Sequence, residues 1–267
     1  PASSFKHFST WFKRVFLSLR EAQIQKLEKS LSPDEAGLPP GLVAPVRAVQ
    51  SAVNAILQPH TGWHTLEFSI QYEELVLNHD TLGKLKVSQL SDGIRNMLAL
   101  VGDIAYRCYK LNAHLGEDAA RLTQGIVMID EVDMHLHPEW QQTVLTDLMA
   151  AFPRLQFIVT THSPLVCQAA IHGSVFRLPR PGSDETPHFI EGAELDRLLY
   201  GNILEAYETE SFGLVETRSA EGQAKLHRLA ELNIKALEEG LTPLEEAERA
   251  SLRAALPTEQ GSTGDLA

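Results

Sequence analysis

The chain has 267 residues, 43% of them hydrophobic, which is enough to build a sizeable α/β core, and its formal net charge at pH 7 is −12. That acidic balance disfavours a surface that binds nucleic acid generally, and it leaves open a local basic strip or a partner protein. Cys108 and Cys167 lack the spacing of a disulfide framework or a zinc site, so we expect a reducing, cytoplasmic compartment. No apolar run reaches the roughly 20 residues of a membrane span, and no signal-peptide pattern is present, so we expect no membrane association.

The first 62 residues predict two helices. Aromatic and aliphatic residues recur at helical spacing over 4–29, with basic residues between them, as in an amphipathic helix. Such a helix could bind a membrane surface or nucleic acid, but packing within a helical subdomain is the more ordinary explanation, and we favour it. A linker rich in Pro and Gly, 31–40, separates it from a second helix, 43–57, which we expect to end before Pro59.

A short hairpin and a capped helix come next. Two strands, 66–70 and 73–78, form the hairpin, and the following helix is predicted over 94–111 with Ser91 as its N-cap. The free N–H groups at the start of that helix, together with the positive end of its dipole, could bind an anion. Taken alone, Ser-Asp-Gly at 91–93 is more simply a turn that caps a helix.

An apolar strand that ends in two carboxylates follows at 125–131. Residues 126–129 are apolar, and Asp130 and Glu131 come directly after them. A strand that is apolar on both faces is typical of the middle of a parallel sheet covered by helices, where ligands bind beyond the carboxyl ends of the strands. One carboxylate could hold Mg²⁺ while the other orients a water, as nucleotide hydrolysis requires. The same pattern also fits a strand that simply leaves the core for solvent.

A helix over 138–152 and a second apolar strand over 155–160 complete one βαβ crossover. The right-handed crossover would bring His162 to the same sheet edge as the two acids, where it could donate to a γ-phosphate oxygen. Taken alone, His162 would be an ordinary polar residue at a strand end. His135 and His137 could instead form a metal site, but no third ligand accompanies them at a recognised spacing.

After His162 we expect a helix through Ala170 and a strand, 174–178, that completes the sheet. A loop over 179–187 and leucine-rich helices from 193 onward follow, and the polar tail is expected to be disordered. The predicted organisation has four parts: a helical lobe over 1–62, the core over 63–190, a helical extension over 191–256 and a tail over 257–267.

Three motifs in this order and spacing resemble those of ABC-type ATPases. Leu90-Ser-Asp-Gly93 resembles the signature motif, Ile126 to Glu131 the Walker B strand with its catalytic Glu, and Thr161-His162 the switch histidine. They are most similar to RecF/OLD-like AAA-family ATPases of bacterial defence systems, and within these to the Septu ATPases and their retron-associated form. The resemblance is specific over residues 85 to 170. It implies an α/β fold with a mostly parallel sheet, a helical lobe before the signature motif and a helical C-terminal extension.

The resemblance also implies roles for individual residues. Asp130 would bind Mg²⁺, Glu131 would polarise the attacking water, and His162 would contact the γ-phosphate of ATP. Ser91 and Gly93 would reach across a dimer interface to ATP held by the other subunit, and the segment from His135 to Pro138 matches a loop that also crosses it. The residues expected to bind ATP are Leu90, Ser91, Asp92, Gly93, Arg95, His135 and His137. Asp92 stands where the commonest signature has a second glycine, and Arg95, one turn further, would offset its charge.

The phosphate-binding loop of such ATPases is absent from the sequence. No G-x-x-x-x-G-K-[ST] occurs, because the one Gly-Lys pair, Gly83-Lys84, is followed by Leu85. The family's loop lies near the N-terminus, and this chain opens with Pro1. We therefore expect the chain to be the C-terminal part of a longer ATPase.

The resemblance implies an ATP-gated homodimer or higher oligomer that hydrolyses ATP with Mg²⁺ in antiphage defence. The C-terminal region lacks the acidic pattern of a Toprim nuclease, and no HNH cluster is present, so the expected effector is a separate HNH-type nuclease. A retron reverse transcriptase with its RNA and DNA is a further candidate partner. Two alternatives stay open: a RecF/SMC-like DNA-repair ATPase, and a scaffold that binds ATP with little turnover.

Overall fold

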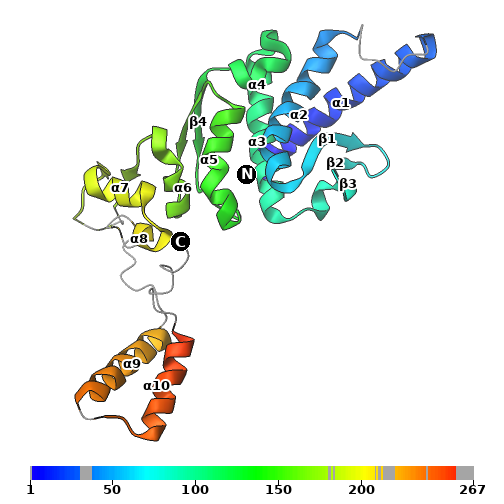
Figure 1. Cartoon of the computed structure of the whole chain (residues 1–267). Helices are drawn as coiled ribbons and strands as arrows, with labels where there is room; N and C mark the ends of the chain where they lie inside the picture. Colours follow the sequence, from blue (N-terminus) through cyan, green and yellow to red (C-terminus); the bar gives the residue numbers. More distant parts are fainter. Residues whose placement is uncertain are drawn as a thin grey trace, which may run out of the picture. The chain divides into compact units, whose positions relative to one another are not determined.

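The computed structural model describes residues 2–30, 38–179, 182, 184–207, 209, 212, 220–238 and 240–256 (Figure 1). The chain consists of two compact units, Pro1–Ala206 and Tyr207–Ala267. The first unit holds a helical layer, three small sheets and the motifs singled out above, and the second holds a pair of helices. The four-part division predicted from the sequence places its boundaries elsewhere, and it stays a prediction.

Three helices build the main core of the first unit. They are α1 (Ala2–Ser30), α2 (Pro40–Thr61) and α3 (Asp92–Leu111). Their aromatic and aliphatic residues recur on one face, and Phe8 and Phe12 of α1 are fully buried in the same hydrophobic core as Ile56 of α2 and Leu98 of α3. Packing of the first helix into the core is therefore confirmed. Residues 31–37 of the expected linker lie outside the described part of the chain.

Helix α2 continues past Pro59, where the sequence predicted its end. A proline removes only its own N–H donor and restricts the residue before it, so the last turn can still form at the end of a helix. Gly62 then closes α2 in the left-handed conformation, with φ of 71°, and its N–H donates to the Gln58 carbonyl at 2.9 Å. A left-handed glycine is a common helix terminator, and here it determines the stop.

The predicted hairpin is present and has a third strand. The strands β1 (Trp63–Ser69), β2 (Glu74–His79) and β3 (Gly83–Lys86) form an antiparallel sheet in that order. A short 3-10 turn, η1 (Val87–Gln89), leads from it into the motif at Leu90. This sheet packs on α1 and α2, and its last strand leads through η1 to the start of α3.

A parallel strand pair confirms the α/β class. After η2 (Ala113–Asp118) and α4 (Ala119–Leu122), the strands β4 (Gly125–Ile129) and β5 (Leu155–Val159) pair in parallel, with α5 (Pro138–Ala151) as the crossover. Both strand ends and the helix fall within a residue or two of the prediction.

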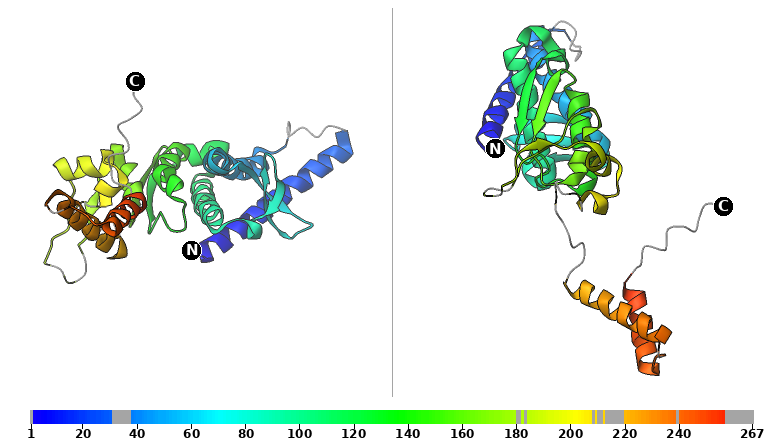
Figure 2. Two further views of the ribbon diagram at one scale, coloured as in Figure 1. Left: turned by 60° about the horizontal axis from the view of Figure 1, so that its bottom comes forward. Right: turned by 90° about the vertical axis from the view of Figure 1, so that its left-hand side faces the viewer.

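The expected burial of β4 on both faces is wrong for the described residues. Successive side chains of a strand point to opposite faces. Val127 and Ile129 pack against the core, whereas Ile126 is 64% exposed and Met128 is 79% exposed. Within the described part of the chain β4 pairs with β5 alone, and the helices cover one face of this pair (Figure 2, right).

The strand expected at 174–178 does not extend the parallel sheet. After α6 (Pro164–Gln168) and η3 (Ala170–His172), the strand β6 (Phe176–Arg177) pairs antiparallel with β7 (His188–Phe189). The rings of Phe176 and Phe189 meet edge to face with centroids 4.9 Å apart, which favours this local pairing. Two helices, α7 (Gly192–Tyr200) and α8 (Ile203–Tyr207), follow.

The second unit is a helical hairpin. It consists of α9 (Ala220–Glu238) and α10 (Pro243–Ala255). Arg228 forms a two-pronged ion pair with Glu248 at 2.9 and 3.0 Å, and Thr242 begins α10 with a capping box. The expected disordered tail, 257–267, lies outside the described residues. No described helix has both the length and the apolar character required to cross a membrane.

Gly102 of α3 allows α1 to pack closely, and we expect Gly102→Ala to destabilise the protein. A Cβ on Gly102 would lie 2.5 Å from Cζ of Phe8, whose ring is fully buried. Overpacking of about 1–3 kcal/mol should outweigh the gain of about 1 kcal/mol in helix propensity. The measurement is the free energy of unfolding in urea. Gly41→Ala in α2 is the matched control, because a Cβ there meets nothing within 4 Å. Equal stability of the two variants would contradict this close packing.

Candidate functional site

The carboxyl ends of β4 and β5 bring the two acids and the histidine segment to one sheet edge. The strands stay paired beyond their last residues, because Thr160 N–H donates to the Ile129 carbonyl at 2.9 Å and Val132 N–H donates to the Thr160 carbonyl at 3.0 Å. Asp130 and Glu131 therefore lie directly opposite Thr160, and His162 follows two residues later. The two acids and His162 are all exposed, so their side chains are accessible to a ligand.

The side chain of Thr160 contacts both acids. Its hydroxyl donates to Oδ1 of Asp130, and the same oxygen accepts the N–H of Glu131 at 2.9 Å. Glu131 has a φ of 49°, in the left-handed region that non-glycine residues seldom occupy. Such strain often occurs at functional sites, where surrounding contacts maintain it.

The segment from Glu131 to His137 forms a compact double turn. Met134 N–H donates to the Glu131 carbonyl and Leu136 N–H donates to the Asp133 carbonyl, both at 3.0 Å. His135 has a φ of 64°. Leu136 is buried, whereas His135 and His137 are exposed. The apolar residue anchors the turn, and the two histidines face solvent.

Polar side chains tie this turn to the segment around His162. Thr161 donates its hydroxyl to Oδ1 of Asp133 and accepts the N–H of Ser163 at 3.0 Å. Ser163 donates to Oε1 of Gln141 at 2.7 Å, and Gln141 donates to the Leu136 carbonyl at 3.0 Å. Both residues that flank His162 are therefore fixed to the turn or to α5.

The Leu90 to Gly93 motif lies where α3 begins. Ser91 is its N-cap, as predicted, but its hydroxyl makes no capping hydrogen bond and is exposed. Asp92 forms an ion pair with Arg95, which also donates to the Ser88 carbonyl at 3.4 Å. The charge of Asp92 is thus offset within the same turn of helix, as the sequence suggested.

Gly93 brings the motif against the histidine turn. A Cβ at this position would lie 2.8 Å from the carbonyl oxygen of His135, so the close approach requires glycine. Leu90 is buried and anchors the motif. The motif and the turn thus meet within one chain.

The possible metal ligands are few. Across the described ranges, no group of three or more His, Cys, Asp or Glu side chains could hold a metal ion, so His135 and His137 gain no third ligand. The donor set of Asp130 and Glu131 nevertheless fits Mg²⁺, which takes one or two carboxylates and completes its shell with water and phosphate oxygens.

Burial makes Cys167 an unsuitable nucleophile. Burial raises the pKa of its thiol to about 11, and the charge of Asp133 adds to the shift. The thiol is therefore protonated at neutral pH, and it is the thiolate that reacts. Among the side chains at this edge, Asp130, Glu131 and His162 are exposed, whereas the Cys167 thiol is buried.

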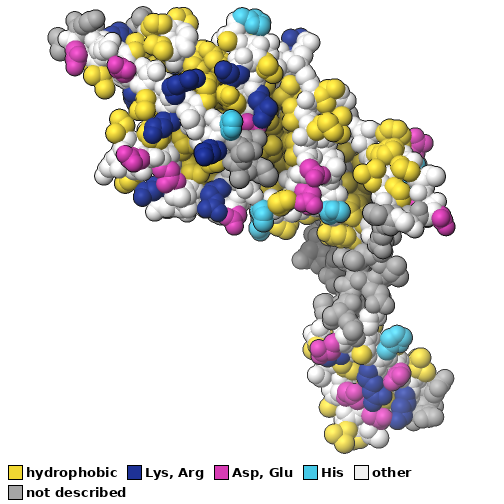
Figure 3. Space-filling model, turned by 180° about the vertical axis from the view of Figure 1, so that it is seen from behind, with side chains coloured by type: hydrophobic (Ala, Val, Ile, Leu, Met, Phe, Trp, Pro, Cys, Tyr) yellow, Lys and Arg dark blue, Asp and Glu magenta, His cyan; other side chains and the backbone are white. Residues whose placement is uncertain are grey.

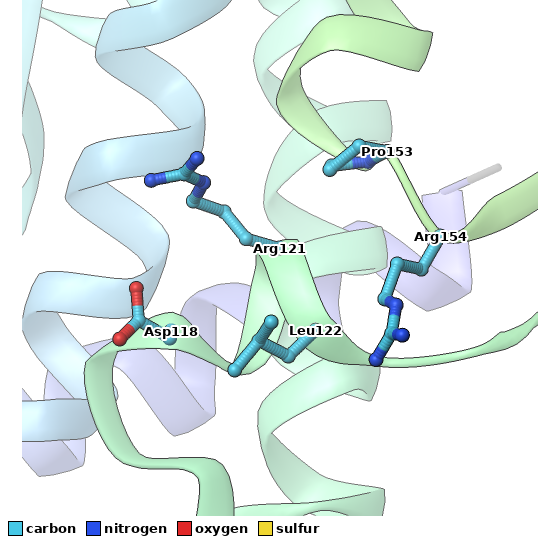
Figure 4. A pocket seen from close by; sticks show the side chains of 5 residues that line it. All are labelled: Asp118, Arg121, Leu122, Pro153 and Arg154. Carbon is cyan, nitrogen blue, oxygen red and sulfur yellow. The ribbon is translucent and has the colours of Figure 1, made fainter.

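Two cavities lie at the opposite end of the strands. The first, of about 380 Å³, is lined by Asp118, Arg121, Leu122, Pro153 and Arg154 (Figure 4). The second, of about 570 Å³, shares Asp118 and Arg121 and extends along α2. Because β4 and β5 begin directly after these segments, the cavities lie at the amino ends of the strands, away from the acids.

Basic side chains gather over part of the surface seen in Figure 3, including around β1 and β3. Arg20 and Lys84 both pair with Glu67, Arg20 at 3.9 Å. Lys86 lies 4.8 Å from the ring centre of Tyr72. Because Glu67 offsets part of the charge of Arg20 and Lys84, this part of the surface has less net positive charge than its Lys and Arg side chains alone would give it.

Sequence reasoning missed the hydroxyl and amide groups that organise the edge. Thr160, Asp133, Gln141 and Ser163 were not predicted to contribute. The available signal was the pair of hydroxyl residues before His162 and the serine after it, since such side chains often bond to nearby backbone and carboxylates.

The site can be compared with known proteins. A family model described as "AAA domain, putative AbiEii toxin, Type IV TA system" matches residues 3–168. The chain is 37% identical to the "Retron Ec83 probable ATPase" of Escherichia coli over 49% of this chain and 24% of that protein. It is 48% identical to the "Retron Vc95 probable ATPase" of Vibrio cholerae serotype O1 biovar El Tor over 31% and 16%.

A third relative belongs to the Septu group. The chain is 43% identical to the "Septu protein PtuA" of Bacillus mycoides (strain KBAB4) over 34% of this chain and 12% of that protein. The similarity to Septu and retron-associated ATPases is thus confirmed. The matched part of the chain spans about a quarter or less of the length of these curated relatives.

Proposed function

Because the chain belongs to the AAA-domain family whose model spans residues 3–168, we propose that it supplies part of the ATP site of a defence protein. In this proposal two copies close on ATP, hydrolyse it and thereby control a separate nuclease. The observation that carries the proposal is the shared edge of β4 and β5, where two exposed carboxylates and an exposed histidine come together.

Each residue of this edge has a distinct task in the proposed hydrolysis. Asp130 would hold Mg²⁺, which would neutralise phosphate charge when bound. Glu131 accepts a hydrogen bond from the attacking water and orients it toward the γ-phosphate. His162 donates to a γ-phosphate oxygen and stabilises the charge that the transition state spreads over these oxygens. The direct test is ATP turnover by the full-length protein with and without Glu131.

The exposed start of α3 supports a shared site. Ser91 has a free hydroxyl at the positive end of a helix of 20 residues, where an anion is stabilised. The same end is held against His135 through Gly93, so the motif and the turn present one surface. We place this surface against ATP bound by a second copy, with Leu90, Asp92, Arg95 and His137 as its supporting residues.

The bare face of β4 and β5 supports a role within a larger assembly. Ile126 and Met128 are mostly exposed, although apolar side chains of a parallel sheet are normally covered. The relatives are several times longer than the matched region. We propose that further polypeptide of the full-length protein, with its phosphate-binding loop, covers this face.

The proposed effector is an HNH-type nuclease that docks on the C-terminal helices. In the α9–α10 hairpin, Leu237 is 89% exposed and Leu244 is 85% exposed, and both lie near the connection between the helices. A partner protein that covers these two leucines would account for their exposure, and this supports the placement.

We expect Leu237→Ser with Leu244→Ser to abolish co-purification of the nuclease while ATP binding stays intact. Loss of two leucines that the nuclease would cover should weaken the complex at least tenfold. The measurement is co-purification from cells that express both full-length proteins. Leu82→Ser is the matched control, because Leu82 is 67% exposed in the turn between β2 and β3. Undiminished binding by the double variant would move the interface elsewhere.

A further inference from the structure

We infer that Thr160 is a positioning residue that holds both acids of the site through a single hydroxyl. The inference rests on the proposed ATPase function and extends it to a residue with no assigned role. Thr160 does not touch the substrate in this account. It acts through Asp130 and Glu131.

The hydrogen bonds of Thr160 account for this role. A hydroxyl has one proton to donate and lone pairs to accept, and here the proton goes to Oδ1 of Asp130 while a lone pair accepts the N–H of Glu131 at 2.9 Å. One side chain thus fixes the carboxylate of the first acid and the backbone of the second. The bond to Asp130 involves a charged acceptor, which makes it stronger than a neutral one.

The backbone of Thr160 also pairs the ends of β4 and β5, through two hydrogen bonds that do not involve its side chain. Thr160 N–H donates to Ile129 at 2.9 Å, and its carbonyl accepts the N–H of Val132 at 3.0 Å. These two bonds do not involve the side chain, so the strands should stay paired in any variant at position 160 that keeps the backbone N–H, as valine and serine do. Loss of the hydroxyl should therefore change only the conformations of Asp130 and Glu131, which lie between these two backbone hydrogen bonds.

Glu131 depends most on this contact. Its φ of 49° is unfavourable for a residue with a Cβ and must be maintained by surrounding bonds. The hydroxyl of Thr160 accepts the N–H of this strained residue. Without that bond, Glu131 can relax toward ordinary backbone angles, and its carboxylate then points away from the water that it must orient.

Asp130 depends on the contact through its rotamer. With Oδ1 held by Thr160, the carboxylate is fixed in one orientation, and its other oxygen remains available to a cation. Residues that orient a metal ligand in this way typically contribute 10- to 100-fold to metal affinity or activity. The hydroxyl should therefore influence both Mg²⁺ dependence and turnover.

The test compares Thr160→Val with Thr160→Ser in the full-length protein. Valine keeps the shape of threonine and lacks the hydroxyl, whereas serine keeps the hydroxyl. We expect Thr160→Val to lower kcat and to raise the Mg²⁺ concentration that gives half-maximal activity, with a combined effect of roughly 10- to 100-fold. Thr160→Ser should keep both quantities within a few-fold of the wild-type values. Thr143→Val is the control, because Thr143 lies on α5 and donates to a backbone carbonyl at 3.5 Å.

A second measurement does not depend on activity. Hydrogen exchange of the nucleotide-free protein should show faster exchange of the Glu131 amide in Thr160→Val, normal exchange in Thr160→Ser, and unchanged exchange of the Val132 amide in both. Equal exchange and equal Mg²⁺ dependence in Thr160→Val and wild type would overturn the inference. A Thr160→Ser variant as impaired as Thr160→Val would also overturn it, because the methyl group would then be the important part.

Glu131→Gln separates this inference from the function on which it rests. If Glu131→Gln loses turnover and Thr160→Val does not, the ATPase proposal stands and the positioning role is wrong. If Glu131→Gln hydrolyses ATP at the wild-type rate, both are wrong.

Discussion

Glu131→Gln is expected to abolish ATP turnover by the full-length protein while ATP still binds. Glutamine has the same shape as glutamate but cannot accept the proton of the attacking water, and general-base catalysis is worth about 100- to 10,000-fold. The backbone N–H of residue 131 can still donate to Thr160, so the local conformation should persist. We therefore expect kcat to fall at least 100-fold with little change in the Kd for ATP.

The matched control for this prediction is Glu139→Gln. Glu139 is an exposed carboxylate in the first turn of α5, with Oε2 at 3.8 Å from Nδ1 of His137, and it lies outside the strand edge. Its substitution should leave kcat unchanged. Wild-type turnover by Glu131→Gln would remove Glu131 from the mechanism, and loss of ATP binding would indicate a structural role instead.

Ser91→Arg is expected to inactivate a homodimer, and mixing it with Glu131→Gln is expected to restore activity. The long cationic side chain would occupy the exposed start of α3, where the partner's triphosphate is proposed to bind. In a mixed dimer, one composite site carries both lesions and the other carries neither, because each site takes its acid from one subunit and its Ser91 from the other.

The size of the recovery is a sharp criterion. When two inactive variants mix freely in equal amounts, half of the dimers are mixed and each has one intact site, so about a quarter of the wild-type rate should return if the sites act independently. The homodimer of either variant alone should stay inactive. Mixed dimers that form and stay inactive would show either that the site lies within one subunit or that both sites must act together.

The sequence predicted the elements whose pattern is local. Apolar periodicity and capping residues gave α1, α3 and α5, and the two short strand-like runs at 66–70 and 73–78 gave the hairpin of β1 and β2. The chain order of strand, helix and strand was enough to place Asp130, Glu131 and His162 at one edge, because a crossover helix makes the two strands parallel and their carboxyl ends then meet at the same edge. The candidate acids could therefore be proposed from the sequence alone.

Contacts between distant residues could not be predicted in this way. Asp130 and Thr160 are 30 positions apart, and their hydrogen bond exists because β4 and β5 pair in a register that no local pattern specifies. The contact between Gly93 and the His135 carbonyl likewise depends on where α3 lies against the turn. A glycine in a motif indicates that space is needed, but only the fold identifies the neighbour.

Strand pairing was likewise decided by the tertiary structure. The apolar run at 126–129 has the same composition whether one face or both faces are covered, and the structure leaves Ile126 and Met128 exposed among the described residues. The strand near 174–178 was identified, but its partner is β7 and not the parallel pair. The sequence by itself determined which residues can form strands, helices and a cluster of acids. The tertiary structure decided which strands pair and which hydroxyl holds the acids, because backbone hydrogen bonds are chemically alike and only the path of the chain selects between them.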